Sequence, residues 1–178
     1  MPPIESALIV VVPQAEPLVR PFRARHDPSA AAGVPAHITL LYPFLAPDVV
    51  DARVLEDLRE CFSGFTPISF ALASIRRFPD VLYLAPDPDE PFRQLTRAIA
   101  DRFQTPPYRG RWPDIIPHLS VAQLADEAQL ERIACEFAPV AGRMLPIAAT
   151  ARDVTLMDNH SGRWEVCATF GLGPAQGA

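Results

Sequence analysis

Two short segments of the chain carry one pattern, and this repetition restricts the possible folds more than any other feature of the sequence. The first segment reads PAHITLLYPF and contains His37 and Thr39, and the second reads IIPHLSVAQ and contains His118 and Ser120. Side chains alternate between the two faces of a β-strand, so each histidine shares a face with the hydroxyl residue two positions later. The residues between them are apolar. We therefore predict two strands, each with a polar and an apolar face.

The predicted elements follow one order twice. In the first half we expect a strand over 7–12, a helix over 17–25, the first histidine strand over 37–42, a helix over 51–62 and a strand over 67–73. In the second half we expect a strand over 81–85, a helix over 90–103, the second histidine strand over 115–121, a helix over 126–137, a strand over 147–157 and a hairpin strand over 164–170. This order indicates an internal duplication within a single domain, 1–178, with approximate repeats 7–74 and 81–170. A pseudo-two-fold axis between such repeats would bring the two histidines together.

Composition limits the partners and the location that we expect. A net charge of −5 and a pI near 5.3 argue against a long nucleic-acid footprint held by many phosphate contacts, but they allow a small anionic ligand at a locally basic site. The three cysteines form no C-x-x-C pair, and the apolar runs are too short to cross a membrane. We therefore expect a cytoplasmic monomer with no membrane partner.

Two histidines on neighbouring strands predict acid–base chemistry at phosphorus. Imidazole titrates near neutral pH, so one ring can accept a proton while the other, held charged, donates one. Such a pair could catalyse in-line displacement at a phosphodiester without a metal or a cofactor. The hydroxyls of Thr39 and Ser120 could donate hydrogen bonds to the non-bridging phosphoryl oxygens and stabilise the charge that grows on them.

Other interpretations of the motifs are less consistent with their context. A single histidine-x-hydroxyl triplet more often has a structural role, but two copies at matched positions of a duplicated order favour catalysis. The spacing fits neither H-E-x-x-H nor a cysteine–histidine zinc pattern, so we predict no metal ligands. A serine nucleophile is disfavoured, because Ser120 lies on the same strand face as His118 and the chain has no G-x-S-x-G motif.

The sequence resembles the two-histidine (2H) phosphoesterase superfamily, and within it the bacterial 2′-5′ RNA ligase-like family. The resemblance rests on His37-Ile38-Thr39-Leu40 and His118-Leu119-Ser120-Val121, which match that superfamily's two histidine-x-threonine/serine-x motifs. The duplicated order extends the resemblance over nearly the whole chain.

The resemblance implies a fold, a site and a chemistry. The fold would be α+β, with two lobes whose antiparallel sheets face a central cleft and whose helices lie outside. His37, Thr39, His118 and Ser120 would be the catalytic residues lining that cleft. Members of this superfamily act without metal on 2′-5′ linkages or 2′,3′-cyclic phosphates of small nucleotides or RNA ends, and some join RNA halves. The implied partner is therefore a small nucleotide cyclic phosphate or a short 2′-5′ oligonucleotide.

Further side chains are candidates for substrate binding. Tyr42 is predicted to continue the face of His37 and Thr39. Arg76 and Arg77, which fall in the expected loop before the second repeat, could neutralise a phosphate. The 105–112 loop mixes aromatic and arginine side chains, which suits the stacking of a base. Its candidates are Tyr108, Arg109 and Trp112.

Two non-enzymatic hypotheses stay open at this point. The chain could be a module that binds a nucleotide or an RNA end without turning it over. It could also be a protein-interaction domain in which the cleft has lost its chemistry. Ligand binding without turnover would favour the first hypothesis, and ligand-induced stabilisation would argue against the second.

Overall fold

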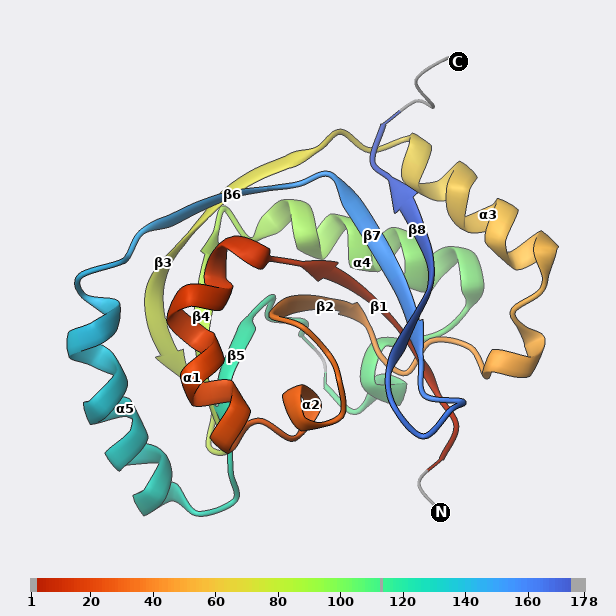
Figure 1. Ribbon diagram of the computed structural model, residues 1–178. Coiled ribbons are helices and arrows are strands. Elements are labelled where there is room, and N and C mark those ends of the chain that lie inside the picture. The colour runs from red at the N-terminus through yellow and green to blue at the C-terminus, as the bar shows by residue number, and fades with distance from the viewer. Residues whose placement is uncertain (1–2, 113, 174–178) are drawn as a thin grey trace.

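Two four-stranded antiparallel sheets carry the two histidine motifs on their edge strands. The computed structural model describes residues 3–112 and 114–173 (Figure 1). Sheet A has the strand order β2-β1-β7-β8, and sheet B has the order β5-β4-β3-β6. Every pair of neighbouring strands is antiparallel. The α+β class and the two antiparallel sheets expected from the sequence are confirmed.

The strands of sheet A are β1 (Ser6–Val11), β2 (His37–Leu41), β7 (Asp153–Asp158) and β8 (Glu165–Gly171), and those of sheet B are β3 (Ile68–Arg77), β4 (Val81–Asp87), β5 (Leu119–Gln123) and β6 (Ile147–Ala151). The α-helices are α1 (Glu16–His26), α2 (Pro28–Ala31), α3 (Ala52–Ser63), α4 (Glu90–Phe103) and α5 (Glu127–Ala141). Short 3₁₀ helices are η1 (Pro13–Ala15), η2 (Pro47–Val49) and η3 (Pro107–Gly110).

One face of each motif strand is buried, and the other is partly exposed. In β2, Ile38 and Leu40 are almost fully buried, whereas His37 and Thr39 keep some exposure. In β5, Leu119 and Val121 are fully buried, and Ser120 between them is not. We call the polar side the motif face. The period-2 alternation read from the sequence therefore holds over 37–40 in β2 and over 119–121 in β5, and it breaks at the next residue of each strand, which is also buried.

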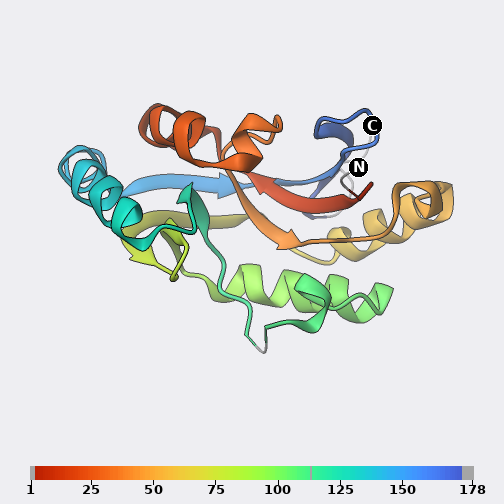
Figure 2. The same cartoon turned by 90° about the horizontal axis from the view of Figure 1, so that it is seen from below.

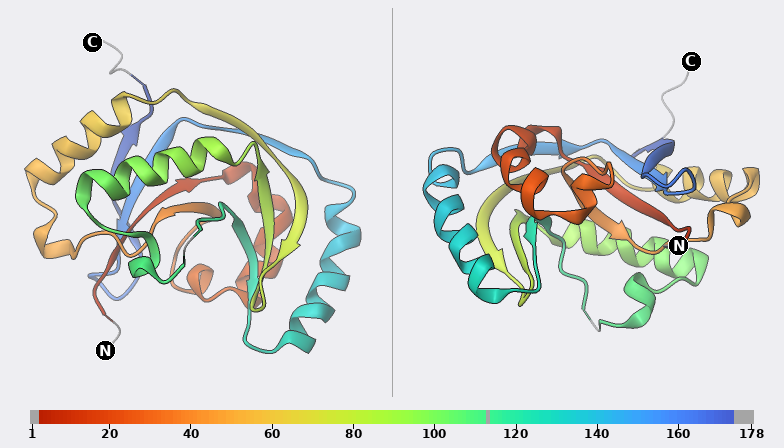
Figure 3. Two further views of the ribbon diagram at one scale, coloured as in Figure 1. Left: turned by 180° about the vertical axis from the view of Figure 1, so that it is seen from behind. Right: turned by 60° about the horizontal axis from the view of Figure 1, so that its bottom comes forward.

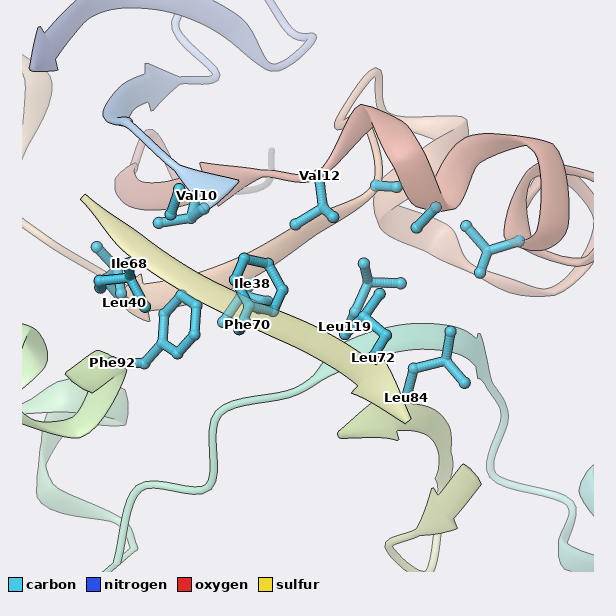
Figure 4. Packing of buried hydrophobic residues seen from close by; sticks show 14 of the residues in the cluster. Val10, Val12, Ile38, Leu40, Ile68, Phe70, Leu72, Leu84, Phe92 and Leu119 are labelled. Carbon is cyan, nitrogen blue, oxygen red and sulfur yellow. The ribbon is translucent and has the colours of Figure 1, made fainter. Parts of the chain in front are cut away.

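A single apolar cluster joins the opposite faces of the two sheets. Figure 4 shows its centre, where side chains from both sheets meet around Phe70 and Phe92. The two rings pack edge to face with centroids 5.0 Å apart. Leu40 of sheet A and Leu72 of sheet B belong to the same cluster. The lobes therefore share one core, and neither sheet has to bury its apolar face alone.

The first helix of each lobe packs against the histidine strand of the other lobe. Helix α1 follows β1 of sheet A but contacts β5 of sheet B, and α4 follows β4 of sheet B but contacts β2 of sheet A. Figure 2 shows α1 and α4 on opposite sides of the strands, and Figure 3 shows α4 close to β2 from behind, with α3 and α5 at opposite ends of the molecule. This exchange, described below as the reciprocal helix packing, holds β2 beside β5.

The sheets do not coincide with the two halves of the sequence. The expected strand over 147–157 is two strands, β6 in sheet B and β7 in sheet A, separated at Arg152. Strand β3 belongs to the first half of the chain but lies in sheet B, between β4 and β6. The charged pair Arg152-Asp153 interrupts the apolar residues of 147–157, but propensity alone cannot show that the chain changes sheet there.

Two of the longer helices begin at an aspartate that accepts a backbone hydrogen bond. The Asp51 carboxylate accepts from the Val54 N–H at the start of α3, and the Asp126 carboxylate accepts from the Gln129 N–H at the start of α5. Asp89, at the N-cap position of α4, makes no such bond. Its carboxylate pairs with Arg93 at 2.9 Å instead.

Within the described residues, no helix has the length and apolar character needed to cross a bilayer.

The shared core predicts a large cost for truncating its central ring. Phe92 is fully buried, so Phe92→Ala should lower the free energy of unfolding by about 3–5 kcal/mol through lost burial and a cavity. Val166, on β8, is 60% exposed, so Val166→Ala should change the free energy of unfolding by about 0.5 kcal/mol or less. Urea-induced unfolding measures both values. Similar losses in the two variants would contradict the assigned core.

Candidate active site

His37 is the first residue of β2, and one of its ring nitrogens is fixed by the backbone. Its Nδ1 lies 2.8 Å from the carbonyl oxygen of Pro35, two residues earlier. A carbonyl oxygen can only accept, so Nδ1 carries the hydrogen in this bond. In the neutral ring Nε2 is then the nitrogen with the free lone pair, available to accept a proton.

His118 repeats this arrangement just before β5. Its Nδ1 lies 2.7 Å from the carbonyl oxygen of Ile116, again two residues earlier. The same tautomer follows for the same reason, with Nε2 as the free nitrogen. The two halves of the chain therefore hold their histidines by the same backbone contact, although the preceding proline is two residues away from His37 and one residue away from His118.

The reciprocal helix packing brings the two motifs together. Strands β2 and β5 are edge strands of different sheets, and they lie in contact. The two rings are close enough that a positive charge on His118 lowers the pKa of His37. Thr39 and Ser120 follow their histidines on the motif face. The structure thus assembles two imidazoles and two hydroxyls, distant in sequence, in one region.

Burial keeps both rings neutral at neutral pH. Loss of solvent lowers the pKa of His37 to about 4, with smaller opposing and reinforcing effects from nearby groups. The Pro35 carbonyl raises this pKa, the Arg23 guanidinium lowers it, and Asp27 raises it. Burial also lowers the pKa of His118, against the rise caused by the Ile116 carbonyl. A positive charge on His118 would lower the pKa of His37 further.

Two aromatic residues that the sequence interpretation did not assign to the site surround His118. The Phe78 ring packs edge-on against the imidazole at 5.2 Å, and the Tyr83 ring lies 5.3 Å from it. Phe78 and Tyr83 also stack on each other at 4.4 Å. Tyr83 lies directly opposite Ser120 in the β4–β5 ladder. Only this register, which depends on tertiary pairing, places the two rings at the site.

A buried ion pair near His37 was also missed. Arg23 and Asp27, one turn apart at the end of α1, pair at 2.8 Å with side chains 3% and 1% exposed. Arg23 also donates to the Val34 carbonyl, and Asp27 accepts from the backbone N–H of Ser29. These bonds fix the segment that leads into β2. The (i, i+4) spacing of opposite charges was visible in the sequence, but its burial was not.

Tyr42 reaches the motif face by a route different from the expected one. It lies three residues after Thr39, so strict alternation would place it on the opposite face. A β-bulge between the pairs Ile9–Thr39 and Leu8–Leu41 shifts the alternation by one residue. Tyr42 therefore joins the small apolar cluster on the motif face of sheet A, against the Trp164 ring at 6.0 Å.

The Tyr42 hydroxyl is engaged by Glu5. It donates to that carboxylate at 2.5 Å, and burial followed by this contact raises the pKa of Tyr42 to about 12. The other Glu5 oxygen accepts from Arg109 at 2.6 Å. The expected binding residue Arg109 is thereby neutralised by an internal carboxylate.

Tyr108 lies beside the first motif. Its backbone N–H donates to the Tyr42 carbonyl at 2.7 Å, which attaches η3 to the end of β2. Burial raises the pKa of Tyr108, and the neighbouring Thr39 hydroxyl opposes that rise. Tyr108 and Arg109 both have positive φ, 50° and 55°, a conformation that side chains other than glycine rarely adopt. Backbone strain of this kind often accumulates at functional sites.

The three remaining candidates for substrate binding, Arg76, Arg77 and Trp112, lie in different environments. Arg76 is exposed in β3 and lies directly opposite Tyr83. Arg77 points to the other side of that strand and forms an ion pair with Glu131 of α5, so the structure does not bring it to the motif face. Trp112 is 57% exposed and stacks with the Arg111 guanidinium at 5.2 Å.

The described residues bring together no group of three or more histidine, cysteine, aspartate or glutamate side chains that could hold a metal ion. A surface hollow of about 680 Å³ is lined by residues of β1, η1, β3, β8 and the β6–β7 segment, and none of the four motif residues lines it.

The duplicated fold and the paired histidine-x-hydroxyl motifs define a class of phosphoester-processing proteins. The chain belongs to the 2′-5′ RNA ligase superfamily, whose family model matches residues 11–163. A “Putative phosphoesterase” of Bacillus pumilus (strain SAFR-032) is 31% identical over 164 residues, which cover 85% of this chain and 87% of that protein.

Solved structures share the fold at lower sequence identity. E. coli LigT complexed with 3′-AMP superposes with a TM-score of 0.62 at 16% identity, covering 96% of this chain and 98% of LigT. TT0787 of Thermus thermophilus gives a TM-score of 0.56 at 15% identity, covering 97% of this chain and 100% of that protein. The resemblance inferred from the two motifs is confirmed.

The lowered histidine pKa values predict a pH dependence of stability. The unfolded chain binds a proton at His37 below its ordinary pKa of 6.5, whereas the folded protein does so only near pH 4. Stability should therefore fall as the pH drops from about 6.5 to about 4. In His37→Gln this fall should be smaller by about 1–2 kcal/mol. Urea unfolding between pH 7 and pH 4.5 measures it.

His160 supplies the matched control. It is exposed in the β7–β8 turn, so His160→Gln should keep the pH dependence of the unmodified protein. Equal pH dependence in the His37→Gln variant and in the unmodified protein would show that the His37 ring is not held neutral by burial.

Proposed function

We propose that this protein is a metal-independent phosphoesterase that opens 2′,3′-cyclic phosphates, or cleaves 2′-5′ phosphodiesters, of small nucleotides or RNA ends. The observation that carries the proposal is the matched pair of Nδ1–carbonyl bonds at His37 and His118. Each bond leaves one Nε2 for proton transfer and fixes the orientation of its ring. Family membership supports the class of reaction, and the site supports the mechanism.

Binding of an anionic phosphodiester activates the pair. A negative charge beside the two rings favours imidazolium and raises both pKa values from their lowered state towards neutrality. Repulsion between the rings keeps the total at one proton. The neutral ring then accepts a proton from the attacking water or hydroxyl, while the charged ring donates one to the leaving oxygen. The two roles exchange when the reaction runs in reverse.

The two hydroxyls stabilise the phosphoryl group. Thr39 and Ser120 each lie two residues after a proposed catalytic histidine and on the same face. Their hydroxyls can therefore reach the non-bridging oxygens of a phosphate held between the rings. Tyr108, beside Thr39, provides an aromatic surface next to the phosphate on which a base can stack. E. coli LigT has been crystallised with 3′-AMP, NADP+ and ATP, which supports a small nucleotide as the ligand class here.

Activity measurements test the assignment directly. With EDTA-treated protein and a nucleoside 2′,3′-cyclic phosphate, His37→Ala and His118→Ala should each lower kcat/KM by about 10²-fold or more, because each removes a proton-transfer step. Thr39→Val and Ser120→Ala should lower it by about 10–10²-fold through the lost hydrogen bond. The pH profile of kcat/KM should be bell-shaped.

His160→Ala is the control for a general effect of losing a histidine, and its activity should match that of the unmodified protein. Full activity in both single variants, His37→Ala and His118→Ala, would refute the acid–base assignment. Nucleotide binding without turnover, unchanged by His37→Asn, would support a non-catalytic binding module in its place.

A further inference from the structure

A row of three side chains crosses sheet B beside the second motif. Arg76 on β3 lies directly opposite Tyr83 on β4, and Tyr83 lies directly opposite Ser120 on β5. Directly opposite residues of antiparallel strands project from the same face of the sheet. Arg76 therefore shares the motif face with Ser120, and the aromatic contacts of Tyr83 join this row to His118.

Arg76 lies directly across the β3–β4 ladder from Tyr83, which places its charge beside the site. In agreement with this placement, the Arg76 charge lowers the pKa of the Tyr83 hydroxyl, against the larger rise caused by burial. The two inter-strand spacings between Arg76 and Ser120 amount to on the order of 10 Å between backbones. Because the arginine side chain is long, its guanidinium can lie closer to Ser120 than the backbone of Arg76 does, at about the length of one nucleotide unit.

Three other arginines near the two motifs already form ion pairs. Arg23 pairs with Asp27, Arg109 pairs with Glu5, and Arg77 pairs with Glu131 on the opposite side of β3. Across the residues that the structure describes, Arg76 has no such ion pair, and its side chain is exposed. The chain has a net charge of −5, yet Arg76 has no carboxylate partner among the described residues. Its guanidinium is therefore available to bind an anion of a ligand.

We propose that Arg76 binds a second phosphate of the substrate, one nucleotide unit away from the phosphorus held between the histidines. This inference rests on the proposed function and narrows its substrate class to nucleotides with a second phosphate, such as a 5′-phosphorylated nucleoside 2′,3′-cyclic phosphate. The reacting phosphodiester has one negative charge, which the imidazolium already balances. A second phosphate requires a further cation, and the guanidinium can hold it through two hydrogen bonds.

Equilibrium binding tests the proposal without depending on turnover. The ligands are adenosine 3′-phosphate and adenosine 3′,5′-bisphosphate, which differ only in the second phosphate, and titration calorimetry gives their Kd values. In the unmodified protein the bisphosphate should bind about 10-fold or more tightly than the monophosphate, because a charge-assisted bond to a phosphate contributes about 1.5–3 kcal/mol. This preference should weaken as the salt concentration rises.

Substitutions at two neighbouring arginines then locate the effect. Arg76→Gln should reduce the ratio of the two affinities to near one, and Arg76→Lys should keep part of it because lysine is a point charge without the guanidinium fork. Arg77→Gln, on the opposite side of the same strand, should leave the ratio unchanged. Thermal unfolding of each variant checks that the fold is retained.

The outcomes separate this inference from the proposed function. No preference for the bisphosphate in the unmodified protein, or an undiminished preference in Arg76→Gln, would overturn the role of Arg76 even if the protein hydrolyses cyclic phosphates. A preference that Arg76→Gln abolishes in a protein with no hydrolytic activity would support the second-phosphate site and refute the enzymatic proposal.

Discussion

The reciprocal helix packing is the interaction on which the site depends. Strands β2 and β5 are edge strands of different sheets, so no shared ladder of backbone hydrogen bonds fixes their relative position. Helix α1 covers β5, and α4 covers β2, so each lobe buries apolar surface of the other. The shared core around Phe70 and Phe92 makes the arrangement one cooperative unit. Two residues 81 positions apart, His37 and His118 (118 − 37), can therefore keep a defined relation.

Within this frame, the backbone rather than other side chains orients the rings. In both motifs the carbonyl two residues before the histidine accepts from Nδ1, so the tautomer is set by the strand's own entry segment. The surroundings then differ. His37 lies near the buried Arg23–Asp27 pair, whereas His118 packs against Phe78 and Tyr83. The two copies of the motif therefore lie in different environments.

Several local features were predictable because they depend on short-range physics. The alternation of polar and apolar residues in β2 and β5, the amphipathic helix α4 and the aspartate caps of α3 and α5 all arise within a few residues of sequence. Other features depend on longer-range contacts. The change of sheet at Arg152, the bulge that turns Tyr42 to the motif face, and the extension of β3 through Arg77, where the sequence indicates a loop, are set by strand pairing.

By itself, the sequence determined the repeated strand–helix order, the α+β class and the two histidine-x-hydroxyl motifs, because periodicity and turn residues act locally. The tertiary structure alone decided which strands pair, that α1 and α4 exchange lobes, and that Phe78, Tyr83 and Arg23 surround the histidines. Those outcomes depend on strand register and on packing between segments that are far apart in the chain. Many strand pairings would satisfy the same pattern of apolar residues, and only packing into one shared core selects among them.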